Sequence, residues 1–316
     1  MKKIIFAICS LICFVSYGQH TEYLDDAKLT KFAEDLTKLP FTERDVILKA
    51  IDLFEQQFKN DRECADWAYQ LLYYYHELSC EDKTNTLHVH WSDEQIRALK
   101  VNDIEVIPGI RSGMKDFEKE YSKYGYRVRS YEDTTYAIEV NPAFVFNKVE
   151  KYLTNDYRLY RSHWIKEHDV PAYIQLNPPY WHAKQVISTK EVMSRIQWRD
   201  ELIDRVKDFS REDLVTREIE GLCFIVTKGL ENTSIYDDKG VIKKEYKDAL
   251  QTYYRSHTQT TWGKYMTEFV HRLALNKYRF SNDIDQWVLS QLFPAGRKNT
   301  DPLLKYEDIL IDNLMD

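Results

Sequence analysis

Residues 126–153, YRVRSYEDTTYAIEVNPAFVFNKVEKYL, interrupt a chain that otherwise reads as one helix after another. Side chains of opposite character alternate over residues 126–140 on either side of a polar turn, which predicts a β-hairpin. Asn141 and Pro142 then predict the start of a helix, because Asn caps helix ends and Pro fits the first helical position. A lone hairpin is not stable in water, so helices must cover it. We therefore predict a mainly α protein with one inserted β-hairpin at about residues 126–140.

Apolar residues recur at helical spacing on both sides of this stretch, and short connections separate the predicted helices. Consecutive helices joined in this way pack as antiparallel neighbours. Before the hairpin, the pattern predicts a three-helix unit over residues 22–79. A polar loop at 81–86 and a brief extended segment at 87–91 are expected to follow. The whole chain thus reads as a multi-helix array of antiparallel helical pairs.

The predicted domain organisation is simple. Linkers rich in Gly, Ser or Pro are missing, so residues 19–316 are expected to form a single helical domain. A subdivision is possible near residues 101–112, where Pro108 and Gly109 interrupt the periodicity. Residues 1–18 are predicted to lie outside the fold.

The N-terminal residues read as a secretory signal peptide. Lys2 and Lys3 precede an apolar run over residues 4–15, and small residues then lead to a cleavage point after Gly18. The apolar run is too short to span a membrane. The sequence therefore predicts a periplasmic or secreted protein, with no transmembrane segment after cleavage.

The cysteines bear on both export and redox state. A lipoprotein anchored through Cys9 or Cys13 is the rival reading, but isoleucine precedes each of them where a small residue is expected. Cys64 and Cys80 are expected at opposite ends of one helix, roughly 24 Å apart, which is too far for a disulfide. Either one of them pairs with Cys223 or all three are thiols, and we expect no disulfide framework.

Charge and composition limit the partners. The chain has 51 acidic against 44 basic residues and a net charge of −7, with both signs interspersed. This balance argues against nucleic acid as the partner, because nucleic-acid binding needs a basic stripe. Glycines are scattered singly, and neither a phosphate-binding loop nor a nucleophile elbow is present. We therefore predict no cofactor and favour a protein without catalytic activity.

Two groups of residues are candidates for binding. Tyr180, Trp181 and His182 follow a Pro-Pro pair in the aperiodic segment 172–182, where exposed aromatic residues could stack on sugars or anchor a partner. The alternative is that these rings fold back over a helix groove. Arg127 and Arg129 make the hairpin polar and could form a recognition edge, or could guard against unwanted strand pairing.

The pattern that most resembles a metal site is His88-Val89-His90. In an extended segment both imidazoles would face the same side and could reach one ion. No third histidine stands at a fixed position relative to the pair, so these two residues are only weak candidates, and the sequence predicts no metal site.

The order of features from Tyr126 to Phe280 is similar to that of an uncharacterised group of exported, helix-rich bacterial proteins. The resemblance consists of the Tyr-rich hairpin, its Pro-started helix, the capped helix after Ser188, and the Gly229 turn before a Tyr-rich helical pair. It covers about half of the chain and implies location and fold, with no activity.

These observations favour an exported, non-enzymatic protein that binds a protein or a cell-envelope glycan. The alternative is an envelope hydrolase with a carboxylate pair in a cleft near the hairpin, because such a pair needs no sequence motif.

Overall fold

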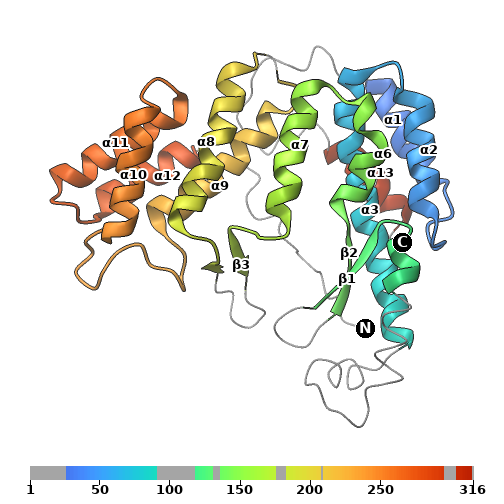
Figure 1. Ribbon diagram of the computed structural model, residues 1–316, viewed down its shortest axis with the longest axis horizontal. Coiled ribbons are helices and arrows are strands. Elements are labelled where there is room, and N and C mark those ends of the chain that lie inside the picture. The colour runs from blue at the N-terminus through green and yellow to red at the C-terminus, as the bar shows by residue number, and fades with distance from the viewer. Residues whose placement is uncertain are drawn as a thin grey trace, which may run out of the picture. The chain divides into compact units, whose positions relative to one another are not determined.

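A computed structural model describes residues 26–90, 118–130, 136–175, 183–207, 209–294 and 304–314. Helices make up most of these residues (Figure 1), and the strands form two short antiparallel pairs. The predicted mainly α fold with a hairpin inserted at about 126–140 is confirmed. The predicted signal peptide lies outside the described residues.

The chain divides into two compact units, with the boundary between Ile165 and Lys166. We call residues 21–165 with 302–316 the hairpin unit, and residues 166–301 the groove unit. The expectation of a single domain over 19–316 stays a prediction, and the possible subdivision near 101–112 lies outside the described residues.

The hairpin unit contains eight helical elements and one pair of strands among its described residues. These are α1 (Asp26–Thr37), α2 (Val46–Phe58), α3 (Arg62–His90), β1 (Tyr126–Ser130), β2 (Tyr136–Val140), α6 (Pro142–Val149), the short 3-10 helix η2 (Glu150–Tyr152), α7 (Asn155–His168, whose last three residues belong to the groove unit) and α13 (Leu304–Leu314), together with the helical residues at 118–122.

The hairpin forms as its sequence predicts. β1 and β2 pair antiparallel, with Tyr126 opposite Val140. Asn141 caps α6 by accepting a hydrogen bond from the Ala143 N–H at 3.2 Å, and Pro142 begins the helix. Helices cover the hairpin, since α3 packs along β2.

Helix α3 is longer than its sequence suggests. The expected loop at 81–86 and the expected extended segment at 87–91 are wrong, because α3 continues to His90. The reason is a long-range contact: the Thr84 hydroxyl, on this added part of the helix, accepts a hydrogen bond from the Ile138 N–H of β2 at 2.9 Å. Docking against the hairpin favours helix over the local preference for a loop.

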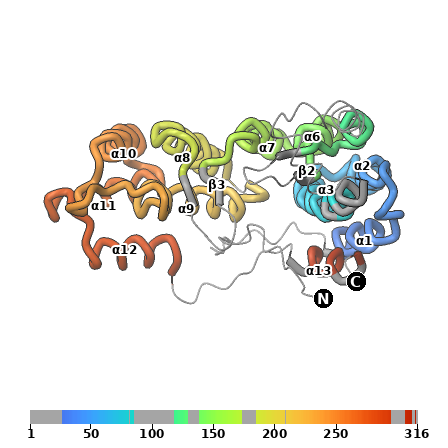
Figure 2. The backbone as a smooth tube through the Cα atoms, turned by 90° about the horizontal axis from the view of Figure 1, so that it is seen from below, coloured from blue at the N-terminus to red at the C-terminus, as the bar shows by residue number. Residues whose placement is uncertain are grey.

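The groove unit is built from helices with one short pair of strands. Its described elements are β3 (Tyr173–Gln175), β4 (Ala183–Gln185), α8 (Thr189–Arg205), α9 (Glu212–Lys228), α10 (Lys244–Ser256), α11 (Thr261–Leu275) and α12 (Asn282–Leu292). β3 and β4 pair antiparallel, so the segment 172–182 is not irregular throughout as expected. Figure 2 shows α10, α11 and α12 beside one another, and α8 beside α10.

Local signals start the helices of this unit. Ser188 caps α8 by accepting a hydrogen bond from the Glu191 N–H at 3.2 Å, as the sequence predicts. Thr260 caps α11 through the Gly263 N–H at 3.1 Å. Helix α10 differs, because its N-cap Lys243 makes no side-chain capping bond.

The described cysteines behave as expected. Cys64, Cys80 and Cys223 are all buried thiols, and the first two lie on the uninterrupted helix α3. Burial raises the pKa of Cys80 and of Cys223 well above the usual thiol value. Within the described part of the chain, no helix combines the length and the apolar character that a membrane crossing requires.

Candidate functional site

A groove open to solvent runs between α8 and α10 in the groove unit, with a volume of about 730 Å³. Ligand sites in proteins commonly have volumes of 300–1,000 Å³. Most of the lining side chains carry hydroxyl, amide or charged groups, although the larger part of the exposed lining surface is apolar. They are Gln185, Ile187, Ser188, Thr189, Lys190, Met193, Ser194, Gln197, Thr233, Glu245, Tyr246, Asp248, Ala249, Thr252, Tyr253 and Ser256.

The two helices that form the walls run in parallel. Near their first turns, the Tyr246 hydroxyl of α10 donates a hydrogen bond at 3.3 Å to the side chain of Gln185, which lies four residues before α8. Near their ends, His257 lies 3.2 Å from Glu201. The lining part of α10, residues 245–256, is about 16 Å long at 1.5 Å per residue. The groove can therefore hold an extended chain rather than a single small group.

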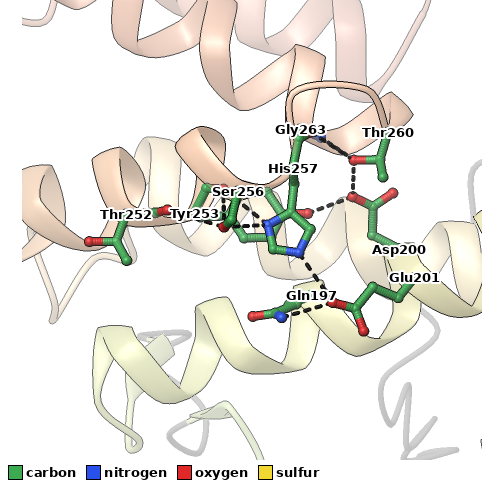
Figure 3. A network of polar contacts seen from close by, with 9 residues as sticks. All are labelled: Gln197, Asp200, Glu201, Thr252, Tyr253, Ser256, His257, Thr260 and Gly263. Atoms are coloured by element: carbon green, nitrogen blue, oxygen red, sulfur yellow. Dashed lines mark hydrogen bonds and ion pairs between the residues drawn. The ribbon is translucent and has the colours of Figure 1, made fainter.

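A network of polar contacts fixes the far end of the groove, where α8, α10 and α11 meet (Figure 3). The buried Asp200 carboxylate of α8 accepts hydrogen bonds from the Tyr253 and Thr260 hydroxyls, both at 2.6 Å. Burial, reinforced by the hydrogen bond to Asp200, raises the pKa of Tyr253. Since Thr260 also caps α11, a single carboxylate joins three helices.

His257 follows the last residue of α10 and stacks on the Tyr253 ring, with 4.6 Å between the ring centroids. Its Nε2 faces the Glu201 carboxylate at 3.2 Å, and Nδ1 lies 3.0 Å from the Tyr253 carbonyl oxygen. Gln197 also donates a hydrogen bond to Glu201 at 2.8 Å, and this bond is the largest cause that lowers the pKa of Glu201. The imidazole therefore ties the end of α10 to α8.

Gly263, in the first turn of α11, leaves no room for a side chain. A Cβ atom there would lie 1.5 Å from the His257 carbonyl oxygen. The close approach of α11 to the end of α10 thus depends on glycine at this position.

The contacts of Ser256 could suggest nucleophilic catalysis. Its hydroxyl lines the groove and lies 2.9 Å from His257 Nδ1, while Glu201 contacts the other ring nitrogen. However, Nδ1 also faces the Tyr253 carbonyl, which requires a proton on Nδ1, and the Ser256 hydroxyl lies within 3.3 Å of two carbonyl groups of its own helix. An imidazole that donates from Nδ1 cannot accept the serine proton. These contacts suit a structural role for Ser256 and His257 at the end of the groove, rather than nucleophilic attack by Ser256 on a bound ligand.

The predicted aromatic binding residues are not part of the described structure: Tyr180, Trp181 and His182 lie outside the described residues. Their position in the chain is informative all the same. Gln185, which lines the groove, comes three residues after His182 and belongs to β4. The predicted binding residues therefore precede, along the chain, the strand that contributes Gln185 to the groove.

The predicted hairpin residues lie in the other unit. Arg127 is partly buried and lies 3.4 Å from the Glu139 carboxylate on the neighbouring strand, so it contributes to pairing within the hairpin. Arg129 lies on β1, and its side chain is outside the described residues.

The expected histidine pair also changes its setting. His88 and His90 lie in the helix α3, so the extended segment on which the argument for a shared face depended is not present. Among the residues that the structure describes, no group of three or more His, Cys, Asp or Glu side chains could hold a metal ion.

One carboxyl group near the hairpin, that of Glu77, has a raised pKa. Glu77 of α3 is accessible to solvent, yet desolvation by the surrounding protein raises its pKa to about 7. The positive charge of Arg161 opposes this rise, while the negative charges of Glu307 and Glu139 add to it. A carboxyl group of this kind can carry a proton at neutral pH.

Comparisons with known proteins add no relative. No family model matches the chain, and neither a curated protein nor a solved structure shows significant similarity to it. The resemblance over Tyr126 to Phe280 accordingly stays an expectation from the order of the elements.

Proposed function

We propose that this protein is an exported, non-enzymatic binding protein, and that the groove between α8 and α10 binds a glycan of the cell envelope. One observation carries the proposal: the groove of about 730 Å³ is lined mostly by hydroxyl and amide side chains. Such groups exchange hydrogen bonds with the hydroxyl and acetamido groups of a sugar chain. The aromatic residues Tyr180 and Trp181, close in the chain to Gln185 of the groove, are suited to stacking on sugar rings.

A glycan is favoured over a protein partner by the shape and chemistry of the walls. A peptide groove usually offers a continuous apolar stripe or a free sheet edge. Here the apolar lining side chains are Ile187, Met193 and Ala249, and they are interspersed with hydroxyl groups. The joined ends of α8, α10 and α11 hold the walls in place before a ligand arrives, which limits the entropy lost on binding.

The test is a calorimetric titration of the full exported chain with an N-acetylglucosamine trisaccharide. Ala249→Trp fills the groove, and we expect it to weaken binding at least about tenfold. Ala274→Trp is the matched control, because it makes the same substitution at an exposed position of α11 outside the groove. Equal affinity in both variants would contradict the proposal, as would a wild-type protein that binds neither this trisaccharide nor longer cell-wall glycans.

A second candidate, an envelope hydrolase acting near the hairpin, is favoured by the raised pKa of Glu77. A carboxyl group with a pKa of about 7 is suited to protonate a leaving group at neutral pH. Glu139 of β2 would then be the partner carboxylate.

The measurement for this candidate is the release of reducing ends from purified cell-wall glycan. Glu77→Gln should abolish release, whereas Glu118→Gln, which changes an exposed carboxyl group, should leave it intact. Absence of release by the wild-type protein would exclude the hydrolase and leave the binding proposal standing.

Export is proposed on the N-terminal sequence alone. Mass spectrometry of the protein recovered from a bacterial envelope fraction should find Gln19 as the first residue. A retained Met1, or a lipid on Cys9 or Cys13, would contradict soluble export.

A further inference from the structure

The charged side chains that line the groove all lie at one of its ends. Lys190 belongs to the first turn of α8, and Glu245 and Asp248 belong to the first five residues of α10. Because α8 and α10 run in parallel, these first turns lie at the same end. From Gln197 and Thr252 onward, the lining side chains are neutral.

The charged end presents both signs within a short distance along the groove. Lys190 is exposed and offers an ammonium group to an anion, and Glu245 and Asp248 are exposed carboxylates that suit a cation. Asp248 also contacts Lys244 at 3.0 Å, an exposed pair that water screens strongly.

The start of α10 adds a second feature that attracts an anion to the charged end. Lys243, the N-cap residue of α10, makes no side-chain hydrogen bond to the first turn of this helix, whose N–H groups have no partner within the helix itself. The positive end of the helix dipole favours a carboxylate at this position. By contrast, the Ser188 hydroxyl already caps the neighbouring α8.

The neutral end has the opposite character. Gln197, Thr252 and Ser256 present oxygen atoms that can accept hydrogen bonds, because their donors already bond to Glu201 and to carbonyl groups of α10. The Asp200 network behind them joins the helices. Hydrogen bonds to sugar hydroxyls fit this end, whereas a charged group there would find no opposite charge among the lining residues.

Resting on the proposed glycan function, we infer that the ligand is a glycan that carries an amino-acid or peptide substituent. The sugar part occupies the neutral end near Ser256, and the substituent, with its carboxylate and ammonium groups, occupies the end formed by Lys190, Glu245 and Asp248. The lining part of α10 is about 16 Å long, which is enough for two sugar rings followed by one or two residues of an extended peptide.

The experiment is calorimetric titration of the full exported chain with two probes. One is a cell-wall disaccharide that carries a tripeptide ending in lysine, and the other is the same disaccharide without the peptide. We expect the peptide-bearing probe to bind about fivefold tighter or more, since each exposed charge contact contributes modestly. Lys190→Met, and separately Glu245→Gln with Asp248→Asn, should each remove most of this difference.

The control variant is Lys264→Met, which removes an exposed positive charge on α11 outside the groove and should preserve the difference. Equal binding of the two probes would overturn the inference while the glycan proposal stands. A preference that survives in the Lys190 and Glu245/Asp248 variants would overturn it too. If neither probe binds and the trisaccharide also fails, the proposed function fails with it.

Discussion

At the corner of α8, α10 and α11, the buried Asp200 carboxylate accepts hydrogen bonds from two hydroxyl groups. Beneath the hairpin, the buried His76 imidazole of α3 has no hydrogen-bond partner on either nitrogen among the described residues. The His76 ring packs edge-on against Tyr126 at 5.0 Å, and burial lowers its pKa to about 3. Both groups are ionisable and buried, but hydrogen-bond donors surround Asp200, whereas His76, among the described residues, packs only against other rings and apolar surface.

This difference shows that buried polar groups can have two opposite effects on a protein. A satisfied carboxylate rigidifies the elements it joins, and here those elements form the groove. An unsatisfied imidazole is stable only while neutral, so it makes the packing of the hairpin on α3 sensitive to acid. Arg161 is an intermediate case: its buried guanidinium lies over the Trp164 ring at 4.0 Å, yet its Nε has no hydrogen-bond partner among the described residues.

The largest loss of stability is expected at Gly263, where α11 approaches the end of α10 most closely. Gly263→Ala places a methyl group against the His257 carbonyl, and α11 must move away from α10. We expect the free energy of unfolding to fall by about 3 kcal/mol or more. Chemical denaturation measures the loss. Gly240→Ala is the control: its left-handed backbone makes alanine unfavourable, but no atom lies near the added Cβ, so about 1 kcal/mol is expected. If the free energy of unfolding falls by a similar amount in both variants, position 263 has room for a side chain.

Removing the Asp200 carboxylate should lower the free energy of unfolding by nearly as much as Gly263→Ala does. Asp200→Ala leaves the Tyr253 and Thr260 hydroxyls without their acceptor, and each unsatisfied buried group costs about 1–3 kcal/mol. We expect a loss of about 3 kcal/mol in the free energy of unfolding, together with weaker glycan binding. A variant that is less stable but binds with unchanged affinity would show that the network does not hold the groove.

Under the hairpin, the prediction concerns pH. The pKa of His76 in the folded protein lies below its usual value of about 6.5, so its contribution to stability is complete above that pH and is lost as the pH falls toward 3. At pH 5 the cost is about 2 kcal/mol by this linkage. His76→Leu should remove that part of the acid sensitivity, measured by denaturation at pH 7 and pH 5.

The exposed His271 provides the matched control for this prediction. His271→Leu should keep the acid sensitivity of the wild-type protein. If the two leucine variants lose stability equally between pH 7 and pH 5, His76 is not the group responsible.

The smallest loss of stability is expected at Glu201, on the exposed side of the contact between α8 and the end of α10. Glu201 is about half exposed and accepts from Gln197 and His257. Glu201→Ala should lower the free energy of unfolding by less than about 1 kcal/mol, because water screens exposed ion pairs. A loss as large as that of Asp200→Ala would mean that His257, rather than Asp200, holds α10 to α8.

The sequence correctly predicts features that depend on residues close together in the chain, and it misses features that depend on residues far apart in the chain. Asn141 and Ser188 act on backbone groups two or three residues away, and the helix starts that they predict are confirmed. The groove depends on pairs far apart in the chain, such as Asp200 with Thr260, and no local pattern marks them. The same limit explains the wrong end of α3, which the contact of Thr84 with Ile138 extends. The one available signal for the groove was the set of hydroxyl residues on these two helices, Thr189 and Ser194 in α8 and Thr252 and Ser256 in α10.

The central claim is that the groove between α8 and α10 binds an envelope glycan, and methionine methyl signals in NMR test it most directly. The Met193 methyl group belongs to a residue that lines the groove, while Met266 is buried in α11 outside it. On titration with the N-acetylglucosamine trisaccharide, the Met193 signal should shift in a saturable manner and the Met266 signal should stay in place. No shift at Met193 at saturating trisaccharide, or equal shifts at both residues, would contradict the account.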